Sequence, residues 1–94
     1  MPIRIVLADD HALVRQGLRV LLEREGFEVI GEAADGREAV QRVQALQPGV
    51  VILDISMPTL NGLDAAREIS KSFPKTKTIL LTQHEEDVYV SGAL

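Results

Sequence analysis

Four short runs of mainly apolar residues alternate along the chain with segments in which apolar residues recur every three or four positions. The short runs have the length and composition of strands and cover residues 3–8, 28–33, 50–54 and 78–82. The longer segments between them are typical of amphipathic helices. Strict alternation of this kind predicts βαβ units, in which right-handed crossovers place helices on both faces of a parallel sheet.

The first predicted helix follows the first strand and ends at Gly26, which fits a left-handed C-cap with Phe27 as its apolar contact. Its apolar face is expected at Leu13, Val14, Leu18, Leu21 and Leu22.

Polar residues mark the starts of the later helices. Asp35, with Glu38 three residues further on, makes a start like a capping box, and Asn61-Gly62 opens a third helix. The acids that end at Asp87 predict the start of a fourth helix from that residue onward. The inward positions expected on the third helix are Leu63, Ala66, Ile69 and Phe73.

Acidic residues end two of the predicted strands. Asp54 closes the apolar run at residues 50–53, and Asp9-Asp10 close the first run. Parallel strands bring their carboxyl ends to one edge of the sheet, where ligands bind in such folds, so these carboxylates and Thr82 are expected in one crevice. Three carboxylates so close together would repel one another, and the crevice therefore predicts a bound cation.

Composition limits the class of protein. The 94 residues are 46% hydrophobic, which suits a single small domain over residues 1–94. A formal net charge of −4 and the lack of a Lys/Arg cluster indicate against direct nucleic-acid binding by this segment. The absence of cysteine excludes disulfides and thiolate metal sites. No targeting segment or membrane span stands out, so a cytoplasmic location without membrane attachment is expected.

The chain carries four motifs in order: Ala8-Asp9-Asp10-His11, Leu53-Asp54-Ile55-Ser56-Met57-Pro58, Asn61-Gly62 and Leu80-Leu81-Thr82. Together they resemble the receiver domains of two-component response regulators, and most of all the branch that carries a LuxR-type helix-turn-helix output domain. This resemblance implies a flavodoxin-like three-layer α/β sandwich with strand order 2-1-3-4-5. It also implies a signalling domain, catalysing only its own phosphorylation and dephosphorylation, that accepts a phosphoryl group from a sensor histidine kinase and switches a transcriptional output domain.

Matched residue by residue, the resemblance implies that Asp54 is the phosphoacceptor in a Mg²⁺-dependent reaction. By the same match, Asp10 binds Mg²⁺ directly, Asp54 supplies a second carboxylate oxygen and the backbone carbonyl of Ser56 a third ligand. Asp9 then orients a metal-bound water.

The resemblance gives weaker indications at three further positions. Thr82 would be the switch hydroxyl that donates to a phosphoryl oxygen. The Ser56 side chain and His84 are candidates for tuning the lifetime of the phosphoryl group, although a solvated loop residue is an equally good interpretation of either. His11 is interpreted as a packing or capping residue before a metal ligand or proton carrier.

The chain departs from the family pattern near its C-terminus, where it stops at Leu94 inside the predicted fourth helix. The receiver domain is therefore expected to be incomplete, with strand order 2-1-3-4 and without a fifth strand or fifth helix. A lysine and an aromatic residue that the family carries on or after its fifth strand would then be absent. Strand four would become an unpaired apolar edge, which predicts a homodimer or larger oligomer through strand four or exchange of the helix-four segment.

Two other function classes stay open. One is an interaction module that keeps the acidic site but works without phosphorylation. The other is a Mg²⁺-dependent phosphohydrolase or nucleotidyl enzyme on a similar sheet. The second is disfavoured because no Gly-rich loop follows the first strand and no second aspartate stands two residues after Asp54.

Overall fold

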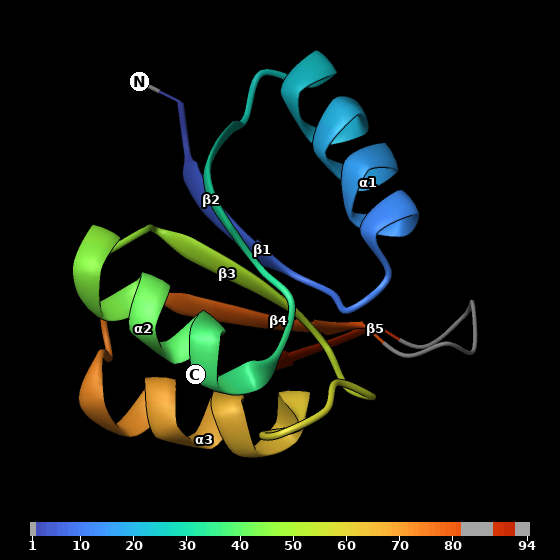
Figure 1. Cartoon of the computed structure of the whole chain (residues 1–94). Coiled ribbons are helices and arrows are strands. Elements are labelled where there is room, and N and C mark those ends of the chain that lie inside the picture. Colours follow the sequence, from blue (N-terminus) through green and yellow to red (C-terminus); the bar gives the residue numbers. More distant parts are fainter. Residues whose placement is uncertain (1, 82–87, 92–94) are drawn as a thin grey trace.

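A computed structural model describes residues 2–81 and 88–91, and it has one sheet with helices on both of its faces (Figure 1). The strands lie in the order β2-β1-β3-β4-β5, and the first four are parallel, which confirms the predicted order 2-1-3-4. None of the helices in these residues is long and apolar enough to cross a membrane. The elements are β1 (Arg4–Ala8), α1 (Ala12–Arg24), β2 (Glu28–Ala33), α2 (Gly36–Leu46), β3 (Val50–Asp54), α3 (Gly62–Ser72), β4 (Lys77–Leu81) and β5 (Val88–Ser91).

The prediction of a fourth helix is wrong for residues 88–91. Val88–Ser91 form a strand, β5, that pairs antiparallel with β4. This run contains two valines and a tyrosine, residue types that favour strands, and it satisfies backbone groups along the outer side of β4. The sheet thus has a fifth strand, and β4 is not the unpaired edge from which the dimer was inferred. We therefore do not propose self-association through that edge.

The predicted helix boundaries are confirmed by their caps. Gly26 has a φ of 92°, and the N–H of Phe27 donates to the carbonyl of Leu22 at 3.0 Å, which is the hydrogen bond of a Schellman motif. Asp35 caps α2 by accepting from the N–H of Glu38 at 2.8 Å. Asn61 caps α3 by accepting from the N–H of Asp64 at 2.9 Å.

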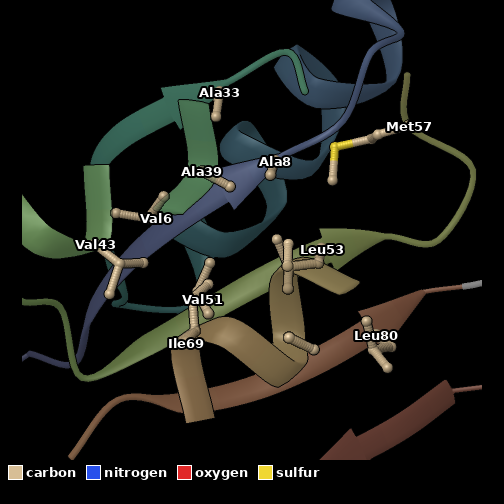
Figure 2. Close-up of a cluster of buried hydrophobic side chains, with 12 residues drawn as sticks. Val6, Ala8, Ala33, Ala39, Val43, Val51, Leu53, Met57, Ile69 and Leu80 are labelled. Carbon is tan, nitrogen blue, oxygen red and sulfur yellow. The ribbon is translucent and has the colours of Figure 1, made fainter. Parts of the chain in front are cut away.

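Two apolar clusters lie on opposite faces of the sheet. The larger one joins alternate residues of β1 and β3, such as Val6 and Leu53, to α2 and α3 through residues such as Val43 and Ile69 (Figure 2). The smaller one lies under α1 and is built around Leu7, with Leu18 and Leu22 of the helix packed against it. The clusters confirm the three-layer arrangement that the alternating pattern predicts.

Part of the predicted apolar face of α1 is exposed. Leu13 is 82% exposed, and Val14 and Leu21 are about half exposed, at 49% and 56%. Only Leu18 and Leu22 of the five predicted residues pack on the core, because in the described residues α1 makes its main contacts with β1 and β2, and its apolar face is wider than that contact. The prediction that Leu63 faces inward from α3 is also wrong, because 43% of its surface is exposed.

Two buried threonines at and just before β4 give a matched test of hydrogen bonding in the core. The hydroxyl of Thr76 donates to the carbonyl of Pro48 at 2.8 Å, whereas the buried hydroxyl of Thr78 has no partner among the described residues. We expect Thr78→Val to raise the free energy of unfolding by about 1 kcal/mol, and Thr76→Val to lower it by about 1–2 kcal/mol. Urea titrations of both variants measure the difference, and a loss of stability in Thr78→Val would contradict it.

Candidate functional site

The site lies where β1 and β3 end side by side. Ala8 pairs with Leu53 across these parallel strands, so the residues that follow each of them, Asp9 and Asp54, leave the sheet at the same edge. The N–H of Asp9 donates to the carbonyl of Ala33 at 3.0 Å, which fixes this end of β1 against β2. The predicted gathering of carboxylates at one edge of the sheet is therefore present for the aspartates.

Three carboxylates and one imidazole lie close together at this edge of the sheet. Asp9, Asp10, His11 and Asp54 each offer one possible ligand atom, and these atoms lie within 4.8 Å of one another. Asp9 and Asp54 are buried, at 5% and 4% exposure, whereas Asp10 and His11 lie on the open side. The group thus has two buried carboxylates and two solvent-exposed members, Asp10 and His11.

Backbone N–H groups accompany the two buried carboxylates. The N–H of Ser56 donates to Oδ1 of Asp54 at 3.2 Å, and that of His11 donates to Oδ1 of Asp9 at 2.8 Å. Within residues 2–81 and 88–91, neither carboxylate forms a salt bridge with a lysine or arginine. The negative charges of Asp9 and Asp54 therefore have no lysine or arginine partner in the described part of the chain.

The pKa of the Asp54 carboxyl is raised above its ordinary value. Burial is the main cause, and the charges of Asp9 and Asp10 add to it, while the hydrogen bond from Ser56 and the nearby His11 act in the opposite direction. A cation placed among these groups would offset both the burial and the repulsion. Hard carboxylate oxygens are the ligands that Mg²⁺ takes in proteins, so the donor set fits that ion.

An ion-pair network supports the loop between β1 and α1. Arg15 donates to the backbone carbonyl of Asp9 at 2.6 Å and to Oε1 of Glu32 at 2.8 Å. The hydrogen bonds from Arg15 and Arg19 hold the pKa of Glu32 below its ordinary value. The sequence did not predict this network, although Glu32, an acid inside a predicted strand, was a signal that could have pointed to it.

The loop after β3 is held at several points around Asp54. The N–H of Ile55 donates to the carbonyl of Leu81, and the N–H of Gly62 donates to the carbonyl of Ile55, each at 3.0 Å. Met57 is 4% exposed and reaches into the larger core cluster, where Figure 2 shows it beside the end of β1. The buried Met57 side chain anchors the loop to the core, whereas Ser56 is exposed at the loop surface.

The remaining sequence candidates divide into two groups. Thr82 and His84 lie outside the described residues. His11 is the N-cap residue of α1, yet its side chain makes no capping hydrogen bond and is 56% exposed, so the expected packing or side-chain capping role is not seen. Its Nδ1 instead lies 3.3 Å from Oδ1 of Asp9 and 3.1 Å from Oδ1 of Asp10.

Known proteins are similar to this chain over nearly its whole length. The family described as response regulator receiver domain matches residues 5–94. The oxygen regulatory protein NreC of Staphylococcus haemolyticus is 47% identical over 97% of this chain, and the chemotaxis protein CheY of Thermotoga maritima is 40% identical over 97%. The match covers 43% of NreC and 76% of CheY, so the chain spans less than half the length of NreC.

Solved structures agree with the sequence matches. A two-component response regulator of the LuxR family from Aurantimonas has a TM-score of 0.84 at 36% identity, covering 90% of this chain and 61% of that one. The receiver domain of the response regulator NarL from Mycobacterium tuberculosis has a TM-score of 0.81 at 34% identity, covering 89% and 68%. These likenesses confirm the flavodoxin-like fold. Since both the sequence and the fold match over most of the chain, this protein belongs to the response regulator receiver domains and is related to the LuxR-family regulators.

Proposed function

We propose that this receiver domain takes a phosphoryl group from a sensor histidine kinase onto Asp54, in a reaction that depends on Mg²⁺. The observation that carries the proposal is the position of Asp54, a buried carboxylate that faces Asp9 and Asp10 with no lysine or arginine partner in the described residues. A buried carboxylate beside two others is poorly accommodated unless a cation joins the group.

The chemistry is a transfer between two activated phosphoryl compounds. A carboxylate oxygen of Asp54 attacks phosphorus, a P–O bond forms, and the P–N bond to the kinase imidazole breaks with its electron pair leaving on nitrogen. The product is an acyl phosphate on Asp54. A small acyl phosphate can act as donor in the same way, with its carboxylate as the leaving group.

The residues of the site fit the Mg²⁺ that receiver domains generally bind. Asp10, Asp54 and the backbone carbonyl of Ser56 would hold the ion, and Asp9 would orient one of its waters. When bound, Mg²⁺ neutralises charge on the phosphoryl oxygens. The backbone N–H of Ser56, 3.2 Å from Oδ1 of Asp54, orients the attacking carboxylate.

Three side chains complete the proposal. Thr82 would report phosphorylation through its hydroxyl, and Ser56 and His84 would influence how long the phosphoryl group survives. Support for Thr82 and His84 comes from the sequence resemblance, and for Ser56 also from its exposed position two residues after Asp54.

The biological role follows the relatives. NreC is named an oxygen regulatory protein, and the Aurantimonas relative is a LuxR-family two-component regulator. We propose that this chain likewise controls transcription through a DNA-binding output domain, in the cytoplasm, as a signalling domain rather than an enzyme with turnover of an external substrate. Its kinase supplies the phosphoryl group, and this segment itself does not contact DNA.

Intact-mass spectrometry tests the phosphoryl transfer. We expect incubation with acetyl phosphate and Mg²⁺ to add one phosphoryl group, and the same incubation with EDTA to add none. Addition that is unaffected by EDTA would contradict the dependence on Mg²⁺. No addition, in a protein that titration calorimetry shows to bind Mg²⁺, would contradict phosphoryl uptake and favour the interaction module.

A further inference from the structure

His11 is the one member of the acidic site whose geometry the proposed Mg²⁺ chemistry does not use. It stands at the N-cap of α1, but its ring takes no part in the cap. The ring turns toward the carboxylates, with Nδ1 at 3.1 Å from Asp10 and 3.3 Å from Asp9. The structure therefore places a nitrogen donor beside Asp10, a proposed ligand of the cation, and beside Asp9, which would orient one of its waters.

The separations agree with ligands that share one ion. Adjacent ligands of an octahedral cation with bonds of about 2.1 Å lie about 3.0 Å apart. Adjacent ligands of a tetrahedral cation with slightly shorter bonds lie about 3.3 Å apart. The Nδ1–Oδ1 distance of 3.1 Å to Asp10 falls in this range, and one possible ligand atom from each of the four residues lies within 4.8 Å of the others.

We propose that His11 supplies an imidazole ligand to the divalent cation of this site and so shifts its preference from Mg²⁺ toward first-row transition ions such as Ni²⁺ and Zn²⁺. The inference rests on the proposed function only in placing a cation among Asp9, Asp10 and Asp54. Mg²⁺ seldom takes nitrogen ligands, whereas imidazole suits Ni²⁺ and Zn²⁺. A site built from three carboxylates alone would discriminate less between Mg²⁺ and these transition ions.

Titration calorimetry of the untagged protein with NiCl₂ and with MgCl₂ tests the proposal. The variant is His11→Asn, because asparagine is a good N-cap residue and keeps the start of α1. We expect this variant to lose Ni²⁺ affinity by about tenfold or more and to change its Mg²⁺ affinity by less than about twofold. Glu68→Gln, which neutralises an exposed acid on α3 that is not part of the site, provides the control and should leave Ni²⁺ affinity within about twofold of the parent.

Two results would overturn the proposal. The first is unchanged Ni²⁺ affinity in His11→Asn. The second is tighter Mg²⁺ binding in that variant, which would mean that the imidazole pairs with the carboxylates and competes with the ion. The ligand atom can be identified by ¹⁵N NMR with Zn²⁺. The chemical shift of His11 Nδ1 should change on addition of Zn²⁺, and that of Nε2 should change less.

The failure of this inference can be told apart from the failure of the proposed function. If His11→Asn still binds Mg²⁺ and still gains a phosphoryl group, while Ni²⁺ affinity is unchanged, only the role of His11 is wrong. If the parent binds Ni²⁺ through His11 but gains no phosphoryl group from acetyl phosphate with Mg²⁺, the metal inference stands and the phosphoacceptor proposal fails.

Discussion

Gly62→Ala is expected to lower the free energy of unfolding by about 2–4 kcal/mol, a large part of the stability of a domain of this size. A Cβ at this position would clash with the backbone carbonyl oxygen of Asp54 and would lie 2.8 Å from the Cα of Ile55. These are backbone atoms, so no flexible side chain can move aside, and either the start of α3 or the end of β3 must shift. Because that strand end carries Asp54, Mg²⁺ affinity should fall together with stability.

The matched control for this prediction is Gly17→Ala in the exposed middle of α1. A Cβ at Gly17 meets nothing within 4 Å, so alanine should raise stability by up to about 1 kcal/mol through helix propensity alone. Thermal unfolding of both variants gives the comparison, and about 1 kcal/mol corresponds to roughly 4–8 °C in a domain of this length. An unfolding midpoint for Gly62→Ala equal to that of the parent would contradict this prediction, because it would mean that the backbone around Asp54 can shift at little cost in free energy.

Asp54→Asn is expected to abolish phosphoryl uptake and, in the absence of divalent ions, to make the protein more stable. The pKa of Asp54 is raised in the folded protein, mainly by burial and then by the neighbouring aspartates, so its ionised form is disfavoured relative to the unfolded chain. The folded protein is therefore stabilised while Asp54 is protonated, and this stability is lost as the pH rises through the folded pKa of Asp54. At neutral pH the ionised Asp54 lowers the free energy of unfolding. Asparagine keeps the shape and removes the charge.

Differential scanning calorimetry in EDTA at neutral pH checks the stability part of this prediction. We expect the unfolding midpoint of Asp54→Asn to exceed that of the parent by a few degrees, which corresponds to about 1 kcal/mol. Mg²⁺ should raise the midpoint of the parent more than that of the variant. Glu68→Gln, which neutralises an exposed acid on α3, is the control and should change neither the midpoint nor phosphoryl uptake. A lower midpoint for Asp54→Asn in EDTA would contradict the electrostatic cost.

The parallel part of the fold could be predicted because local signals and tertiary packing agree there. The apolar runs that form β1 and β3 are buried on both faces, and the caps at Gly26, Asp35 and Asn61 lie where the sequence placed them. The aspartate cluster followed from the same reasoning, since parallel neighbours must end at one edge. The roles of the individual site residues stay predictions.

The errors arose where tertiary context overrides local pattern. The acids before Val88 suggested a helix start, but the backbone pairing available along β4 favours a strand at these residues. The apolar stripe of α1 predicted burial for Leu13, yet in the described residues the main contacts of the helix are with β1 and β2, and Leu13 stays exposed. The bond from Arg15 to the Asp9 carbonyl joins residues whose spacing carries no motif, so only the folded chain reveals it.

The measurement that tests the central claim most directly is the location of the phosphoryl group. The phosphorylated protein is reduced with borohydride, which converts an aspartyl phosphate into homoserine, and is then digested and mapped by peptide mass spectrometry. Our account predicts homoserine at position 54 and unmodified aspartate at positions 9 and 10. Homoserine at Asp9 or Asp10, or a phosphoryl group that resists reduction because it sits on a hydroxyl, would contradict the assignment of Asp54 as the acceptor.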